Sequence, residues 1–140
     1  MREIRFRAWD IENKVMCDVS HIFIANMVLP QTVMASVGSE MKHCPSDAIL
    51  MQFTGLLDRH SKEIFEGDIL KWTNHTKCCN VATWDCLCEV VWESCGFYRR
   101  DILDGTLYGW ANIKNEQVEV IGNIYEHPEM LKEPYAYNQD

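Results

Sequence analysis

Five of the seven cysteines lie close together in the second half of the chain, at Cys78, Cys79, Cys86, Cys88 and Cys95. Four thiolates suit the tetrahedral coordination of zinc, so the candidate metal ligands are Cys78, Cys79, Cys86 and Cys88. Their spacing lacks the Cys-x2-Cys pairs typical of zinc sites, and neighbouring strand residues such as Cys78 and Cys79 point to opposite faces. Small thiols in a hairpin are the simpler interpretation, and we expect no bound cofactor.

Four carboxylates gather in the middle of the chain, at Asp58, Glu63, Glu66 and Asp68, with lysines close by. Some metal-dependent nucleases place an acid before a Glu-x-Lys sequence on one strand. Here Lys62 precedes Glu63, and the gap from Asp68 to Lys71 is wrong for two residues on one strand face. Turn chemistry explains the same residue types, because Gly67 allows a positive φ and Asp68 can bond to nearby backbone. A nuclease is therefore the least favoured function, and we expect no enzyme.

Arg5, Arg7 and Trp9 alternate along the first expected strand and share one of its faces. Basic side chains beside an aromatic ring can bind phosphates and stack on nucleic-acid bases. Arginine stems also cover exposed strand faces and pair with carboxylates. These three residues are the candidate interaction surface. Arg99 and Arg100 are adjacent on another expected strand and therefore face opposite ways.

The 140 residues carry a formal net charge of −8, and 47% of them are hydrophobic. This length and composition predict one globular domain with a core of its own. The acidic balance argues against broad binding to a phosphate backbone, which needs a surplus of Lys and Arg. The sequence shows no secretory-signal pattern and no apolar run of membrane-spanning length. We therefore expect a cytoplasmic protein with reduced thiols and no membrane association.

The first third of the chain is expected to form a β-hairpin over residues 2–24, because apolar and polar residues alternate there. Residues 10–14 form its turn, with Asn13 at a positive φ, and residues 15–24 form the returning strand. Residues 27–47 are punctuated by proline and glycine and are expected to be a long loop. One short helix or strand is expected within it, at residues 32–37.

From Leu50 onward, short strands separated by turn residues predict a small barrel of about five strands. The expected strands are residues 50–57, 62–65, 69–73, 89–93, 97–103, 107–113 and 118–125. Gly122 is expected at a bulge or close approach, and His127 to Leu131 as one helical turn. The predicted fold is mainly β with little helix: an N-terminal hairpin packed on a small SH3-like barrel.

Three blocks of sequence, in order along nearly the whole chain, carry a family resemblance. The first is residues 4–10 (IRFRAWD). The second is residues 50–56 (LMQFTGL), followed by Asp58 and residues 62–69 (KEIFEGDI). The third is residues 119–126 (EVIGNIYE), with Pro128, Glu129 and Leu131. In these blocks the chain resembles the YopX family of phage and prophage proteins. The resemblance implies one small, β-rich domain over residues 1–140, without an established activity. We divide it into a hairpin and loop (1–49), a barrel part (50–127), and a helical turn with a tail (128–140).

Two positions depart from the pattern of that family. Ser61 stands where the family usually has glycine in a turn, and at a positive φ serine is the worse fit by roughly 1 kcal/mol. The turn is expected to be rebuilt here, with His60 in the left-handed region. His127 stands where the family often has asparagine before Pro128, and histidine caps a helix less well.

The resemblance and the lack of a catalytic constellation favour a non-catalytic phage accessory protein that binds another macromolecule, with a protein of the phage or its host as the expected partner. Tryptophans and tyrosines crowd the second half of the chain, and any that are exposed would indicate a self- or partner-binding patch. Strand edges make a homo-oligomer a further expectation. A nucleic-acid-binding small β-barrel is the alternative function.

Overall fold

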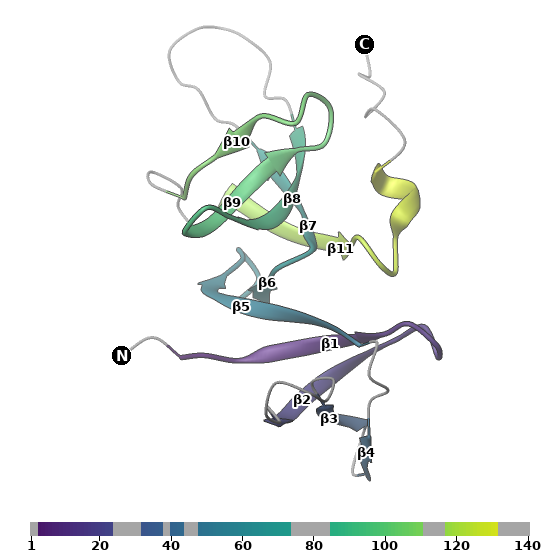
Figure 1. The fold of residues 1–140 in the computed structure, drawn as a ribbon. Coiled ribbons are helices and arrows are strands. Elements are labelled where there is room, and N and C mark those ends of the chain that lie inside the picture. Colours follow the sequence, from purple (N-terminus) through teal and green to yellow (C-terminus); the bar gives the residue numbers. More distant parts are fainter. Residues whose placement is uncertain are drawn as a thin grey trace, which may run out of the picture. The chain divides into compact units, whose positions relative to one another are not determined.

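The computed structural model describes residues 3–23, 32–37, 40–43, 48–73, 85–110 and 117–131, and confirms that the protein is mainly β (Figure 1). The chain forms two compact units, residues 1–53 and 54–140. The division between these units falls within one strand, residues 49–57, and the expected single domain with a part beginning at residue 50 stays a prediction. In the described ranges no helix has the length and apolar character needed to cross a membrane.

The first unit is built from antiparallel strands that extend the expected hairpin. Its strands are β1 (Phe6–Asp10), β2 (Val15–Phe23), β3 (Thr32–Val37), β4 (Glu40–His43) and the beginning of β5 (Ile49–Leu57). The strand order is β4-β3-β2-β1-β5, and β6 (Glu63–Phe65) follows β5 in the same order. Ala8 pairs with Cys17, and both are buried against Val19, Ala48 and Leu50. The period-two alternation thus creates the core face of this sheet.

The hairpin of β1 and β2 confirms the prediction for residues 2–24 with one correction in its turn. The residue with a positive φ (53°) is Lys14 and not Asn13. Asn13 instead donates its backbone N–H and its side-chain amide to the Asp10 carboxylate, at 3.0 and 2.7 Å. This turn therefore uses the side chain of Asn13 and not its tolerance of the left-handed region.

The predicted long loop of residues 27–47 contains two strands in the structure. β3 coincides with the strand alternative for residues 32–37, whereas β4 was not predicted and pairs with β3 from Met34↔His43 to Val37↔Glu40. Residues 24–31, 38–39 and 44–47 lie outside the described ranges.

The second unit contains a five-stranded antiparallel sheet that curls into a half-barrel (Figure 1). Its strands are β7 (Asp68–Thr73), β8 (Asp85–Glu93), β9 (Gly96–Asp101), β10 (Leu107–Tyr108) and β11 (Val118–Asn123), in the order β10-β9-β8-β7-β11. The core consists of buried aliphatic residues, namely Ile64, Leu70, Val90, Val118 and Val120. The sheet has the predicted number of five strands, but the expected strands 50–57 and 62–65 form β5 and β6 of the other sheet. The SH3-like comparison stays a prediction.

Some strand ends differ from the prediction. β8 begins at Asp85, four residues before the expected start, and β10 covers only two residues of the expected 107–113, of which 111–116 lie outside the described ranges. β11 ends at Asn123 because the side-chain oxygen of Asn123 accepts the N–H groups of Tyr125 and Glu126 and forms a turn. The short helix is confirmed as a 3₁₀ turn, η2 (Pro128–Leu131).

The turn before β6 yields a stability prediction. Ser61 has a φ of 63°, so it occupies the left-handed region itself, and the rebuilt turn with His60 in that region was the wrong expectation. Ser61→Gly should raise the free energy of unfolding by roughly 1 kcal/mol, because glycine adopts this φ without strain. Urea denaturation would measure the change. Lys62→Gly, at an exposed neighbour without a positive φ, should be destabilising, and a loss of stability in both variants would contradict the assignment.

Candidate functional site

One arginine lies on the core face of the half-barrel. The strand register pairs Arg99 on β9 with Val90 on β8 and with Tyr108 on β10. Val90 belongs to the buried core, and Trp72 on β7 packs against that same core. Because side chains alternate between faces of a strand, Arg99 points inward among apolar neighbours while Arg100 points outward. The predicted opposition of these two arginines is confirmed: Arg100 is exposed and lies 3.3 Å from Glu93.

Three aromatic rings surround the Arg99 guanidinium, and we call this group the arginine cage. The Arg99 Cζ atom lies 4.9 Å from the ring centroid of Trp72 and 5.7 Å from those of Tyr108 and Trp110. Only 3% of Arg99 is exposed to solvent. Each cation–π contact of this kind contributes on the order of 1 kcal/mol, and more when water is excluded. The rings therefore hold the cation in place.

The hydrogen-bonding capacity of the arginine cage is mostly unused. The Arg99 Nη2 atom donates to the carbonyl oxygen of Gly109 at 3.3 Å. In the part of the chain that the structure describes, the buried Nε and Nη1 atoms of Arg99 have no acceptor, and neither do the indole Nε1 atoms of Trp72 and Trp110. A buried donor without a partner costs about 1–3 kcal/mol, and more when it is charged. The cage thus contains several buried N–H donors without an acceptor in the described residues.

Electrostatics of the cage are dominated by burial. Loss of water around Arg99 lowers the pKa of its guanidinium, although arginine remains charged at neutral pH. Burial also raises the pKa of the Cys88 thiol to about 12, and the nearby Arg99 charge opposes this rise only in part. Cys88 is therefore a neutral thiol, which makes it a poor nucleophile at neutral pH.

One side of the cage belongs to the last strand of the sheet. β10 stands at one end of the strand order, so its outer edge pairs with no strand in the described ranges. Tyr108 covers Arg99 with its ring but is 38% exposed, and its neighbour Leu107 is 39% exposed. Leu103, in the turn before β10, is 64% exposed. An exposed apolar strand edge thus lies directly beside a buried charge with unused donors.

Comparison with known proteins places this fold in a family. The family model described as "YopX protein" matches residues 5–132. The chain belongs to the YopX family. This confirms the resemblance carried by the three sequence blocks. No curated protein matches the chain.

Two solved structures resemble this YopX chain over nearly its full length. Protein EF1440 from Enterococcus faecalis is 25% identical, with a TM-score of 0.66 over 94% of this chain and 99% of that one. Protein yopX from Bacillus subtilis is 20% identical, with a TM-score of 0.59 over 96% of this chain and 99% of that one. The second likeness concerns the fold alone.

Two of the four candidate zinc ligands lie in the described part of this YopX chain. Cys78 and Cys79 lie outside the described ranges. Cys86 and Cys88 lie two residues apart on β8, opposite Trp72 and Leu70, and so share a face, as expected. Among the described residues no group of three or more His, Cys, Asp or Glu side chains could hold a metal ion. The zinc hypothesis stays a prediction for this cluster.

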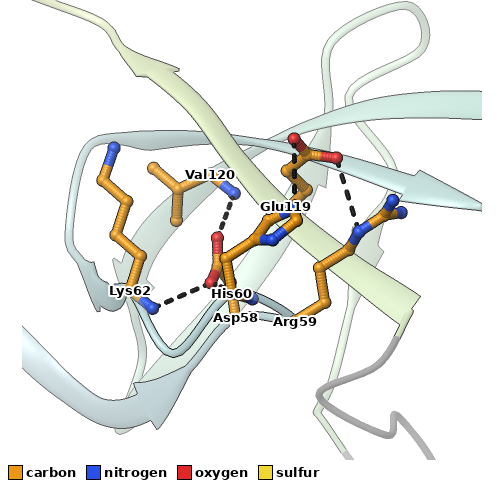
Figure 2. A network of polar contacts seen from close by, with 6 residues as sticks. All are labelled: Asp58, Arg59, His60, Lys62, Glu119 and Val120. Carbon is orange, nitrogen blue, oxygen red and sulfur yellow. Dashed lines mark hydrogen bonds and ion pairs between the residues drawn. The ribbon is translucent and has the colours of Figure 1, made fainter.

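The acids of the middle segment bind backbone. The Asp58 carboxylate accepts N–H groups from His60, Lys62 and Val120 at 2.8, 2.9 and 2.9 Å (Figure 2). Beside it, Arg59 and His60 each lie 3.6 Å from the carboxylate of Glu119 (Figure 2).

The second acidic turn of this YopX protein confirms the expected turn chemistry. Gly67 has a φ of 78°, and the Asp68 carboxylate accepts the Phe65 N–H at 2.8 Å. Glu63 and Glu66 flank the same turn and are half-buried. These contacts assign Asp58 and Asp68 to the fold.

The predicted interaction surface is exposed at Arg5, just before β1, but more covered at Arg7 and Trp9 on β1. Trp9 is only 9% exposed, so its ring leaves little area on which a base could stack. Arg7 is half-buried, and the Arg5 guanidinium lies over the Phe53 ring, 4.8 Å from its centroid. Stacking of Arg5 on an aromatic ring is thus satisfied within the first unit.

The arginine cage was missed at the level of sequence. The alternation Phe97-x-Arg99 indicates that both side chains share a strand face, and Phe97 packs against the core. That signal alone makes Arg99 a candidate for burial. The rings that surround it come from two segments far apart in the sequence, β7 and residues 108–110. The sequence does not state that both lie near β9, so the cage could be found only from the register of β7, β9 and β10.

Proposed function

We propose that this YopX protein is a non-catalytic binding module of a phage or prophage that captures a protein partner in the bacterial cytoplasm. The observation that carries the proposal is the exposed apolar edge of β10, with Leu107 and Tyr108 beside the arginine cage. Backbone groups on such an edge can pair with an extended segment of another chain, which then joins the sheet as a further strand.

A protein partner fits this edge better than a nucleic acid does. Two acids lie close to this edge, Asp101 at the end of β9 and Asp104 in the turn before β10, and the whole chain has a net charge of −8. Binding to a phosphate backbone rests on a surplus of cations. The two arginines of β9 that pair with β10, Arg99 and Arg100, are matched in number by these two acids. A second copy of the chain could also pair along β10, so homo-oligomerisation is part of the same proposal.

A charge placed on the edge tests the proposal. Tagged protein would capture partners from the lysate of a bacterium that carries the phage, and the captured partner would then be purified and titrated by calorimetry. Leu107→Lys should weaken its binding at least tenfold, because a lysine on an edge strand opposes strand addition. Leu131→Lys is the matched control, since Leu131 is 38% exposed, but on η2.

The outcomes separate clearly. Equal binding by both lysine variants would overturn the role of β10. Failure to capture any stoichiometric partner, combined with a monomer in sedimentation, would overturn the binding module itself. A dimer that Leu107→Lys dissociates would identify a second copy of the chain as the partner.

A further inference from the structure

We infer that the arginine cage is a carboxylate-binding site, in which Arg99 and the indole N–H groups of Trp72 and Trp110 bind an acidic group of the partner. This inference rests on the proposed function and names the chemistry that the β10 edge recognises. The carboxylate would come from an Asp or Glu side chain, or from the C-terminus, of a segment lying along that edge.

Unused donors are the first argument. Arg99 is 3% exposed, and its Nε and Nη1 atoms have no acceptor in the described residues. The same holds for Nε1 of Trp72 and Nε1 of Trp110, whose rings flank the guanidinium. Buried donors are nearly always satisfied in folded proteins, so several orphans around one cation indicate a missing acceptor. The aromatic rings stabilise the positive charge of Arg99 through cation–π contacts, but they do not provide oxygen acceptors for its N–H groups.

The missing counter-ion is the second argument. A buried arginine normally pairs with a carboxylate, which its planar fork binds through two parallel hydrogen bonds. Asp101 lies two residues along β9 on the same face, but its carboxylate accepts the N–H groups of Leu103 and Asp104 at 2.7 and 3.4 Å. In the described part of the chain no carboxylate reaches ion-pair distance of Arg99. An incoming carboxylate would supply this pair.

A ligand could reach the arginine cage from the edge of the sheet formed by β10. The orphan atoms of Arg99 are covered, so a ligand must displace one of the rings. Tyr108 is exposed, whereas Trp72 and Trp110 are half-buried. The strand of Tyr108 is also only two residues long. A segment paired along β10 would therefore reach Arg99 by displacing the ring of Tyr108.

A planar carboxylate suits this site better than a phosphodiester. The flat guanidinium is packed by rings on the core side of the sheet, and two acids lie nearby, Asp101 at the end of β9 and Asp104 in the turn that follows. A nucleic acid would bring further negative charges past these two acids, whereas a single side-chain carboxylate would not. A carboxylate should therefore bind more tightly than a phosphodiester in a titration.

Titration of the full chain with sodium acetate tests the inference directly. In a ¹H–¹⁵N spectrum at constant ionic strength, the Nε–H signal of Arg99 and the indole signals of Trp72 and Trp110 should shift together and saturate. A Kd in about the millimolar range is expected for so small a probe. The indole signal of Trp9, which lies on β1 in the first unit, should not move.

Variants sharpen the readout. Arg99→Gln should abolish saturation, whereas Arg100→Gln, which changes the adjacent outward-facing arginine, should leave the titration unchanged. Trp110→Phe keeps a ring but removes one donor and should weaken acetate binding about fivefold. The wild-type titration stands on its own even if Arg99→Gln does not fold.

The alternative results distinguish failure of the inference from failure of the proposed function. Absence of saturable shifts with acetate would overturn it, and so would equal or tighter binding of dimethyl phosphate, which would indicate a nucleic-acid site. Binding of a captured protein that depends on Leu107 but occurs without acetate binding would leave the proposed function standing alone. Acetate binding together with an indifferent Leu107→Lys would instead overturn the proposed function at β10.

Discussion

Replacing Asp58 with alanine is expected to lower the free energy of unfolding of the second unit by about 3–5 kcal/mol. The Asp58 side chain is buried and accepts three backbone N–H groups, two from its own turn and one from Val120 on β11. Removal of this acceptor would leave charge-assisted bonds unmade and the N–H of Val120 buried without a partner. Chemical denaturation followed by tryptophan fluorescence would measure the loss.

Asp104→Ala is the matched control for this prediction. Asp104 also accepts a backbone N–H, from Thr106 at 2.8 Å, but in an exposed turn where water can replace the lost acceptor. Its effect should be much smaller than that of Asp58→Ala. Similar losses in the two variants would mean that the bond to Val120 contributes little beyond ordinary turn chemistry.

The contribution of Asp58 should depend on pH. Burial alone would raise the pKa of this carboxyl, but the N–H groups of Val120, Lys62 and His60, together with the charge of His60, outweigh it and lower the pKa. A lowered folded-state pKa means that the stabilisation is complete above the unfolded value of about 3.9 and is lost as the pH falls through the folded value. The stability gap between the wild type and Asp58→Ala should therefore shrink below about pH 4.

Local turn chemistry was readable in the sequence because few residues decide it. Gly67 and Asp68 were expected to form a turn with a positive φ and a bond to nearby backbone, and both features are present. The positive φ expected at Asn13 is instead found at Lys14. The bonds from Asn13 to Asp10 hold Asn13 in a different conformation, so the next residue takes the left-handed one. The energy difference between a positive φ at residue 13 and one at residue 14 is small, and residue type alone does not reveal it.

Long-range partners were not readable, for a physical reason. The bond between Asp58 and Val120 joins residues 62 positions apart, and it exists only because β11 is positioned beside the turn after β5. Arg99 likewise becomes buried only once β9 is paired with β8 and β10. Alternation indicates which residues share a face, but it does not state which strands are neighbours.

Gly122→Ala is expected to destabilise the second unit by about 1–3 kcal/mol, although it adds a single methyl group. Gly122 is buried at the predicted bulge of β11, where the register against β7 shifts between Val120 and Gly122. An added Cβ would lie 2.9 Å from Nδ1 and 3.1 Å from Cγ of His127, and 3.3 Å from Sδ of Met130. The His127 ring cannot simply retreat, because its backbone N–H bonds to the carbonyl of Asn123 and its carbonyl accepts the N–H of Met130.

A double-mutant cycle would assign this cost to the contact. Gly109→Ala is the control, since no atom lies within 4 Å of its added Cβ and its φ is not positive, so it should be neutral or stabilising by up to about 1 kcal/mol. In a His127→Ala background the space beside Gly122 opens, and the cost of Gly122→Ala should fall by at least half. An unchanged cost in that background would place the strain in the bulge of β11 itself. The close approach to His127 would then explain nothing about why glycine stands at this position.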